Sequence, residues 1–217
     1  QLTERGFTPA HREMAQSLNR DMYEQLVAGI AEGRKKSDAE IRDLLDQGPF
    51  IAGRALEAGL VDELSYEDEL DDRVPDLADG AARRIEGQNY QRITPQSIGV
   101  RPRSRIAFLY IAGRIVSGKS GFDGVNGAVV GSDTIVEQIR KIRDDSSIEA
   151  IVVRIDSPGG SSVASDVIWR ELKITREHDP GRPLVASMGD LAASGGYYVA
   201  MPSEVIVAQP GTLTGSI

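Results

Sequence analysis

One serine of this chain has neighbours that would suit a nucleophile. Ser194 lies in the stretch "MGDLAASGGYY", residues 188–198, which follows an apolar run and precedes two tyrosines. If a helix begins here after a strand, the hydroxyl projects at the edge of a sheet and the Gly195 N–H points toward the same spot. A nucleophile and one donor to an oxyanion would then share a site. These residues alone leave open the alternative that Ser194 is a small residue used for packing.

A serine nucleophile needs a base, and the chain offers no convincing one. The spacing around Ser194 loosely resembles the nucleophile elbow of α/β-hydrolases, in which an acid and then a histidine follow the serine. No histidine follows Ser194, and His11 and His178 both stand in polar stretches. A lysine whose pKa is lowered by burial is the other option. The five lysines fall on helix ends, exposed helix faces or a glycine-rich loop: Lys35, Lys36, Lys119, Lys141 and Lys173. We therefore expect the base of Ser194 to lie outside these 217 residues.

A second stretch, "DSPGGSS" at residues 156–162, could bind an anion. Pro158, Gly159 and Gly160 would let backbone N–H groups turn outward at a helix N-terminus, where an oxyanion is stabilised. A tight turn with a glycine hinge is the alternative. No Lys-Ser/Thr pair follows the glycines and their spacing is not G-x-G-x-x-G, so neither a phosphate loop nor a dinucleotide site is indicated.

Both stretches fall in a region that alternates between strands and helices. Continuous Val/Ile-rich runs predict strands at residues 105–113, 148–156, 183–189 and 204–210. Amphipathic patterns predict helices between them at residues 132–147, 161–178 and 192–203. This alternation is typical of an α/β fold with a mainly parallel sheet. Reactive groups in such sheets gather at the carboxyl ends of the strands, where the two stretches are expected.

The first 64 residues are predicted to be helical. Apolar residues recur at every fourth position after an N-cap at Thr8 and a proline at Pro9: Met14, Leu18, Met22, Leu26 and Ile30. Gly33 is expected to break this helix, and "SDAE" from Ser37 resembles a capping box that opens a second. A third short helix is expected to end near Gly59. Residues 65–97, charged and interrupted by two prolines, are predicted to form a surface helix and linker.

Composition excludes several classes of function. The 25 basic and 33 acidic residues give a net charge of −8, which disfavours a nucleic-acid partner. There is no cysteine, and no stretch approaches the ~20 apolar residues that span a bilayer, so any membrane anchor is expected outside this segment. The acidic run in residues 65–97 lacks the glycine-centred loop of a calcium-binding hand. We predict no metal and no cofactor. Because the chain lacks an initiator Met and ends in "TLTGSI", we expect it to be cut from a longer one.

Taken together, three stretches resemble the signal peptide peptidase A family of serine peptidases. They are the SPGG turn, the "ASGGYY" serine and the terminal "TLTGSI", and their combination is much more specific than any one of them. The resemblance covers residues 98–217 and implies a Clp-protease and crotonase-like α/β fold. It extends upstream, where "GRKKSDAEIRDLLDQGPFIAGRALEAGLVDEL" is similar to the helical segment that follows the catalytic core in this family.

That order implies the long form of the family, with two copies in tandem. Residues 1–64 would be the helical end of a first repeat, residues 65–97 a charged helix and linker, and residues 98–217 the catalytic core of a second repeat, truncated at its C-terminus. The resemblance implies that Ser194 is the nucleophile and that Gly195, Gly159 and Gly160 form the oxyanion hole. Ser216 would orient a lysine general base that comes from the first repeat, upstream of this chain. The segment alone is then expected to be inactive.

The family also implies a substrate, an assembly and a location. Its members degrade cleaved signal peptides and other apolar peptides, assemble into a ring, which predicts a tetramer-like homo-oligomer, and act on the periplasmic side of the inner membrane or its plastid equivalent. Two alternatives remain. A crotonase-like acyl-CoA enzyme would use acids at helix starts, with Asp156 and Asp190 as candidates, and a non-catalytic oligomeric scaffold would keep the fold without the chemistry.

Overall fold

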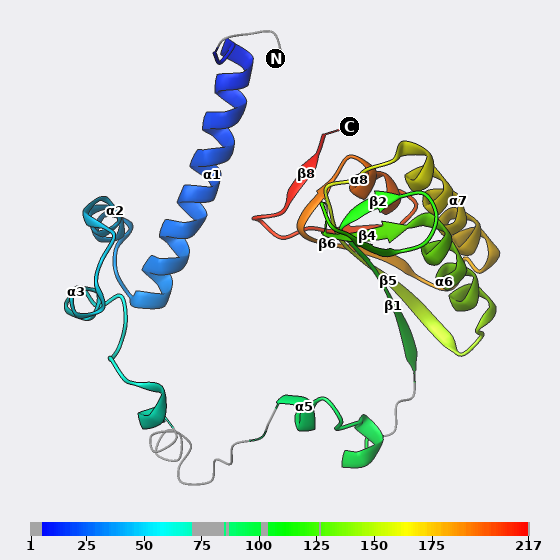
Figure 1. The fold of residues 1–217 in the computed structure, drawn as a ribbon, viewed down its shortest axis with the longest axis horizontal. Helices are drawn as coiled ribbons and strands as arrows, with labels where there is room; N and C mark the ends of the chain where they lie inside the picture. The colour runs from blue at the N-terminus through cyan, green and yellow to red at the C-terminus, as the bar shows by residue number, and fades with distance from the viewer. Residues whose placement is uncertain (1–5, 71–84, 86, 101–103, 126, 217) are drawn as a thin grey trace. The chain divides into compact units, whose positions relative to one another are not determined.

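The computed structural model describes residues 6–70, 85, 87–100, 104–125 and 127–216. It divides into two compact units, Gln1–Thr94 and Pro95–Ile217, which are described separately (Figure 1). Much of the predicted charged helix and linker, at residues 71–84 and 86, lies outside the described residues. Within the rest of that segment the structure has a short helix α5 (Gly87–Tyr90) and a turn of 3-10 helix, η1 (Pro95–Ile98).

The first unit is built on one long helix, α1 (Pro9–Arg34). The predicted cap is confirmed, because the Thr8 hydroxyl accepts a hydrogen bond from the His11 N–H at 3.3 Å. The predicted break at Gly33 is wrong by a short distance. The helix continues past Gly33, and Lys35 ends it with a φ of 53° while its N–H bonds back to the carbonyls of the last turn.

Two short helices follow, α2 (Asp38–Gln47) and α3 (Ala52–Glu57). The predicted capping box is confirmed, since the Ser37 hydroxyl and the Glu40 carboxylate each accept the other's backbone N–H. The buried cluster of this unit is small and consists of Val27, Ala31 and Ile41. Most of the predicted apolar stripe of α1 lies outside this cluster and is exposed: Met14, Leu18, Met22 and Leu26.

The second unit confirms the predicted α/β class with a mainly parallel sheet. Its main sheet has the order β1-β5-β6-β7, with β8 pairing with the far end of β6, and all these pairs are parallel. The strands are β1 (Arg105–Ala112), β5 (Ile148–Ser157), β6 (Leu184–Ala193), β7 (Val205–Val207) and β8 (Leu213–Gly215). Three helices accompany them: α6 (Ser132–Asp144), α7 (Ser162–His178) and α8 (Gly195–Ala200).

Helices α6 and α7 lie along one face of the main sheet (Figure 1), and alternate side chains of the strands build the core against them. On β5, Ile151, Val153 and Ile155 are buried and join the same cluster as Ile168 of α7. On β1 the alternation leaves Phe108 and Tyr110 exposed on the opposite face. The helices therefore cover one face of the sheet, whose strand ends carry the candidate site.

A second, three-stranded sheet was not predicted. It has the order β2-β4-β3 and is formed by β2 (Arg114–Val116), β3 (Gly121–Asp123) and β4 (Gly127–Gly131). Its strands are three to five residues long, too short for a clear alternating pattern. An isolated parallel bridge joins Ile115 of β2 to Gly160. The small sheet thus fixes one side of the SPGG turn.

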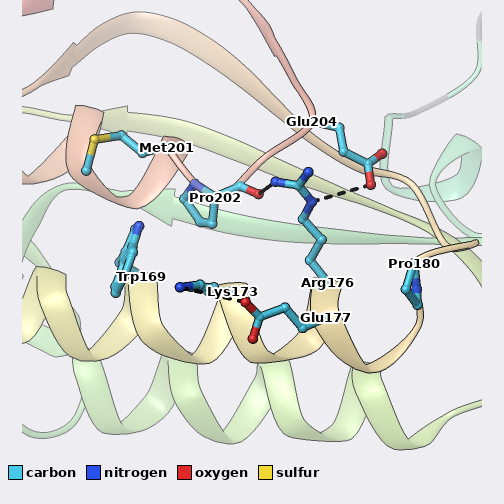
Figure 2. Close-up of a pocket in the computed structure, with 8 residues that line it drawn as sticks. All are labelled: Trp169, Lys173, Arg176, Glu177, Pro180, Met201, Pro202 and Glu204. Atoms are coloured by element: carbon cyan, nitrogen blue, oxygen red, sulfur yellow. Dashed lines mark hydrogen bonds and ion pairs between the residues drawn. The ribbon is translucent and has the colours of Figure 1, made fainter.

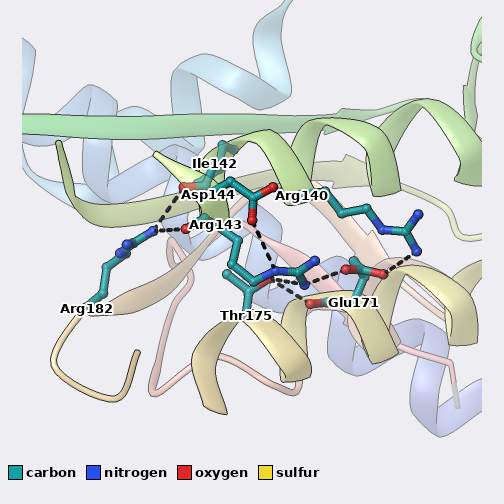
Figure 3. A network of polar contacts seen from close by, with 7 residues as sticks. All are labelled: Arg140, Ile142, Arg143, Asp144, Glu171, Thr175 and Arg182. Atoms are coloured by element: carbon teal, nitrogen blue, oxygen red, sulfur yellow. Dashed lines mark hydrogen bonds and ion pairs between the residues drawn. The ribbon is translucent and has the colours of Figure 1, made fainter. Parts of the chain in front are cut away.

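A partly buried charge network ties α6 to α7 (Figure 3). Glu171, with only 8% of its side chain exposed, accepts from Arg140 at 3.0 Å and from Arg143 at 2.5 Å. Burial by itself would raise the pKa of Glu171, but the hydrogen bonds and charges of these two guanidinium groups outweigh it and lower that pKa. Glu171 is therefore held ionised between the two helices.

Candidate active site

Ser194 stands at a junction that differs from the predicted one. Strand β6 does not end near Gly189, as predicted, but continues to Ala193, because after a register shift its end pairs again with β5 and with β8. The first residues of the predicted helix at 192–203 are therefore strand, and the helix shortens to α8. Sequence patterns miss this because the second half of the strand carries glycine, aspartate and alanine rather than branched residues.

The backbone of Ser194 is held in an unusual conformation. Its φ is 53° and its ψ is −118°, outside the regions that residues with a Cβ favour. Two hydrogen bonds hold it there, because its N–H donates to the Gly215 carbonyl at 2.7 Å and its own carbonyl accepts from the Tyr198 N–H at 2.9 Å. Strain of this kind at a strand-to-helix turn is frequent at functional sites.

The SPGG turn packs directly against Ser194. Gly159 has a φ of 89°, and a Cβ built on it would lie 2.5 Å from the Gly195 nitrogen and 2.9 Å from the Ser194 Cβ. A Cβ on Gly160 would lie 2.0 Å from the Ile115 carbonyl oxygen. Only glycine fits at both positions, so the close approach of the two stretches explains the pair of glycines better than a flexible hinge does.

The three predicted oxyanion amides are not equivalent. The Gly159 N–H donates to the buried Ser157 hydroxyl at 3.1 Å and is therefore already engaged. In the bridge to β2, Ile115 bonds to the Gly159 carbonyl and to the Ser161 N–H, which leaves the Gly160 N–H outside that ladder. Gly195 is the first residue of α8, where an N–H has no partner within its own helix. Gly160 and Gly195 are thus the better placed donors.

A hollow of about 510 Å³ opens at this junction. Four of the predicted site residues line it, namely Gly160, Ser194, Gly195 and Ser216, while Gly159 lies behind them. The other lining residues are mainly from the start of α7 and from α8: Ser162, Val163, Ser165, Asp166, Tyr197, Tyr198 and Met201. None of the lysines in the described part of the chain lines it.

One hydrogen bond at the wall of the hollow was not predicted from the sequence. The Tyr198 hydroxyl donates to the Asp166 carboxylate at 2.7 Å, and this hydrogen bond raises the pKa of Tyr198. It joins α8 to the first turns of α7 across the wall of the hollow. The only sequence signal for it is the second tyrosine of "GGYY". The acids considered for an acyl-CoA enzyme, Asp156 and Asp190, do not line the hollow.

The residues that the structure describes contain neither a cluster of metal-ligating side chains nor a membrane-spanning helix. No group of three metal-ligating side chains comes together there. Among the same residues, no helix is long and apolar enough to cross a bilayer.

The fold and the site together define a class of protein. This is an α/β protein with a serine on a strained turn after a parallel strand, and Gly160 of the neighbouring glycine turn lines the same hollow as that serine. The model of peptidase family S49 matches residues 2–80 and 176–217 of the chain, which is more than half of it. The chain belongs to peptidase family S49.

Named relatives agree with this assignment. The chain is 32% identical to "Serine protease SPPA, chloroplastic" of Arabidopsis thaliana over 100% of this chain and 32% of that protein. It is 34% identical to "Protease 4" of Salmonella typhi over 97% of this chain and 34% of the relative. The chain therefore spans about a third of the length of the curated relatives it matches.

Solved structures show more distant likeness. A "1510-N membrane-bound stomatin-specific protease" shares 23% identity over 52% of this chain and 46% of that one, with a TM-score of 0.39. A ClpP1 from Listeria monocytogenes shares 17% identity over 46% of this chain and 47% of that one, with a TM-score of 0.33.

Proposed function

We propose that the chain is the nucleophile-bearing part of a serine endopeptidase that uses a Ser/Lys dyad. Ser194 is the nucleophile in this proposal. The observation that carries it is the strained Ser194 turn beside the Gly160 and Gly195 amides, all three lining one hollow. Membership of a peptidase family and the names of the relatives support the same reaction class.

The reaction follows from these positions. The Ser194 Oγ attacks the carbonyl carbon of a peptide bond while a lysine amine accepts the hydroxyl proton. Negative charge develops on the carbonyl oxygen, where the Gly160 and Gly195 N–H groups donate to it. The lysine then returns the proton to the leaving amine. Water, deprotonated in turn by the lysine, hydrolyses the acyl-enzyme and restores Ser194.

The lysine is proposed to come from outside these residues, from the first of two tandem repeats. On this view residues 1–64 end the first repeat and residues 98–217 begin the second. Ser216 lines the hollow and has a φ of 55°, so its hydroxyl is proposed to orient the incoming amine. By itself the 217-residue segment would then bind peptides but cleave them poorly.

Apolar peptides, such as cleaved signal peptides, are the proposed substrates. Support comes from the walls of the hollow, where Val163, Tyr197 and Met201 present apolar surface beside Ser194. A ring of four subunits and a site on the periplasmic face of a membrane, or its plastid equivalent, complete the proposal. The membrane anchor would lie in another part of the protein.

The test is replacement of Ser194 in the intact protein. Ser194→Ala is expected to abolish cleavage of casein and of a signal peptide, and to abolish labelling by a serine-reactive phosphonate, because the only attacking oxygen is lost. Ser146→Ala, at an exposed turn residue, is the matched control and should keep full activity.

Each contrary result has a definite meaning. Cleavage that persists in Ser194→Ala would overturn the assignment of the nucleophile. A wild-type protein that assembles but neither cleaves peptides nor takes up the phosphonate would be the non-catalytic scaffold, and one that instead turns over an acyl-CoA thioester would be the crotonase-like enzyme.

A further inference from the structure

A second hollow, of about 570 Å³, is shown in Figure 2. Its floor is the later turns of α7, and the chain after α8 forms the opposite wall. Four side chains make the apolar part of its lining: Trp169, Pro180, Met201 and Pro202. Four charged side chains stand around them: Lys173, Arg176, Glu177 and Glu204.

The charges at this second hollow balance one another. Lys173 lies over the Trp169 ring, 5.4 Å from its centre, and 3.7 Å from the Glu177 carboxylate. Arg176 donates to the Pro202 carbonyl at 3.0 Å and lies 3.6 Å from Glu204. Two cations face two carboxylates, so an ion of either sign gains little here. The preferred occupant is an uncharged, apolar group that covers the Trp169 ring.

The two hollows are neighbours that share a lining residue. Met201 lines both of them. The Trp169 ring lies 5.9 Å from the ring of Tyr198, which belongs to the first hollow. Helix α7 contributes Asp166 to the first and Lys173 to the second. These residues are seven positions apart, which corresponds to ~10 Å along a helix axis and to about three residues of extended peptide.

We infer that the hollow at Trp169 is a second binding subsite for peptide substrates. It takes an apolar or aromatic side chain about three to four residues from the one held beside Ser194. This deepens the proposed function and rests on it, because the first hollow must hold the peptide at the bond to be cleaved. The subsite at Trp169 does not favour a charged side chain, because the charges around it balance. Selection of peptide substrates there therefore depends on peptide length and on one apolar side chain.

Trp169 itself can report binding, because it is the single tryptophan of the chain. The chain carrying Ser194→Ala is titrated with two peptides that share the same central residues. The long peptide has a leucine four residues from the central position, and the short one ends before it. We expect the long peptide to change Trp169 emission saturably and to bind about tenfold more tightly, and the short peptide to leave the emission unchanged.

A second measurement uses cleavage by the intact protein. Trp169→Leu should raise KM for the long peptide about tenfold, to near the value for the short one, and leave kcat and the short peptide unaffected. Tyr110→Leu, an aromatic residue on the exposed sheet face, is the control and should change neither.

The outcomes separate the subsite from the proposed function. Binding of the long peptide to Trp169 without any cleavage by the wild-type protein would keep the subsite and reject the peptidase. Cleavage with no advantage for the long peptide, or an equal emission change with both peptides, would overturn the subsite alone. Emission that depends on protein concentration instead of peptide would show that another copy of the chain occupies the hollow, and would also overturn it.

Discussion

At the scale of single residues, the candidate site depends on two glycines, because glycine has no Cβ atom. Gly159 and Gly160 approach the Ser194 turn and strand β2 so closely that a side chain has no room at either position. The glycines therefore do more than allow a turn. They let two backbone segments meet, so that Gly160 and Gly195 line the same hollow as Ser194.

The close approach at Gly159 predicts a specific loss. Gly159→Ala places a Cβ 2.5 Å from the Gly195 nitrogen at a φ of 89°, so the turn must move and the oxyanion donors shift with it. We expect phosphonate labelling of Ser194 in the intact protein to slow at least a hundredfold. Gly124→Ala, which meets no atom within 4 Å, is the control. Unchanged labelling of Gly159→Ala would show that this contact does not position the site.

The hydrogen bond between Tyr198 and Asp166 predicts a pKa change. Because the neutral phenol donates to the carboxylate, the pKa of Tyr198 is raised in the folded state. The stabilising bond is present below the unfolded pKa of tyrosine and is lost as pH rises through the higher folded pKa. Asp166→Asn should lower that pKa toward ~10. An ultraviolet absorbance titration measures the tyrosine pKa values, and Tyr198→Phe identifies the part of the absorbance change that comes from Tyr198. If Asp166→Asn left this titration unchanged, the hydrogen bond between Tyr198 and Asp166 would be refuted.

At the scale of elements, helices α6 and α7 are joined by Glu171 and its two arginines (Figure 3). Removing this carboxylate leaves Arg143, whose side chain is only 16% exposed, without its main partner. Glu171→Gln is expected to lower the free energy of unfolding by about 3 kcal/mol. Glu137→Gln, which removes an exposed pair with Lys141, is the control and should change the free energy of unfolding much less. Urea unfolding followed by Trp169 fluorescence measures both, and equal effects would contradict the role of Glu171.

The same carboxylate predicts acid sensitivity. The pKa of Glu171 is lowered in the folded state, so its contribution is fully present above the unfolded value of ~4.3 and is lost as pH falls through the folded one. The stability difference between wild type and Glu171→Gln should therefore shrink as pH falls below ~4. A difference that stays constant from neutral pH down to that range would exclude the ion pair as its source.

At the scale of the whole molecule, the residues that the structure describes form two separate cores of very unequal size. One consists of three buried residues, including Ile41, and the other of eighteen, including Ile168. Stability is then expected to differ between the two units, since burial of apolar surface is the main favourable contribution in each.

This inequality predicts two unfolding transitions. Ile41→Ala should lower the denaturant midpoint of the weaker transition, seen by circular dichroism, and leave the transition reported by Trp169 unchanged. Ile168→Ala should lower the Trp169 transition, by about 2–5 kcal/mol. A single transition that both substitutions shift equally would show that the two cores unfold together.

Much of the architecture could be predicted from sequence because its signals are local. Caps at Thr8 and Ser37 and the apolar period of α7 each depend on a few neighbouring residues, and all three are confirmed. The three-stranded sheet and the second half of β6 were missed, because short strands of small residues owe their structure to the strands beside them. The apolar stripe of α1 has a clear period, yet period alone does not say whether a partner covers it.

For the candidate site as well, some features could be predicted from the sequence and others depend on the tertiary structure. By itself the sequence determined the α/β class, the serine and glycine stretches at the strand ends and the family resemblance, because these depend on residue type and order. Only the tertiary structure decided that the Gly159 N–H is engaged while Gly160 faces the hollow, that Tyr198 bonds to Asp166, and that a second hollow opens at Trp169. Each of these depends on residues far apart in the chain, whose distance is set by packing and not by spacing.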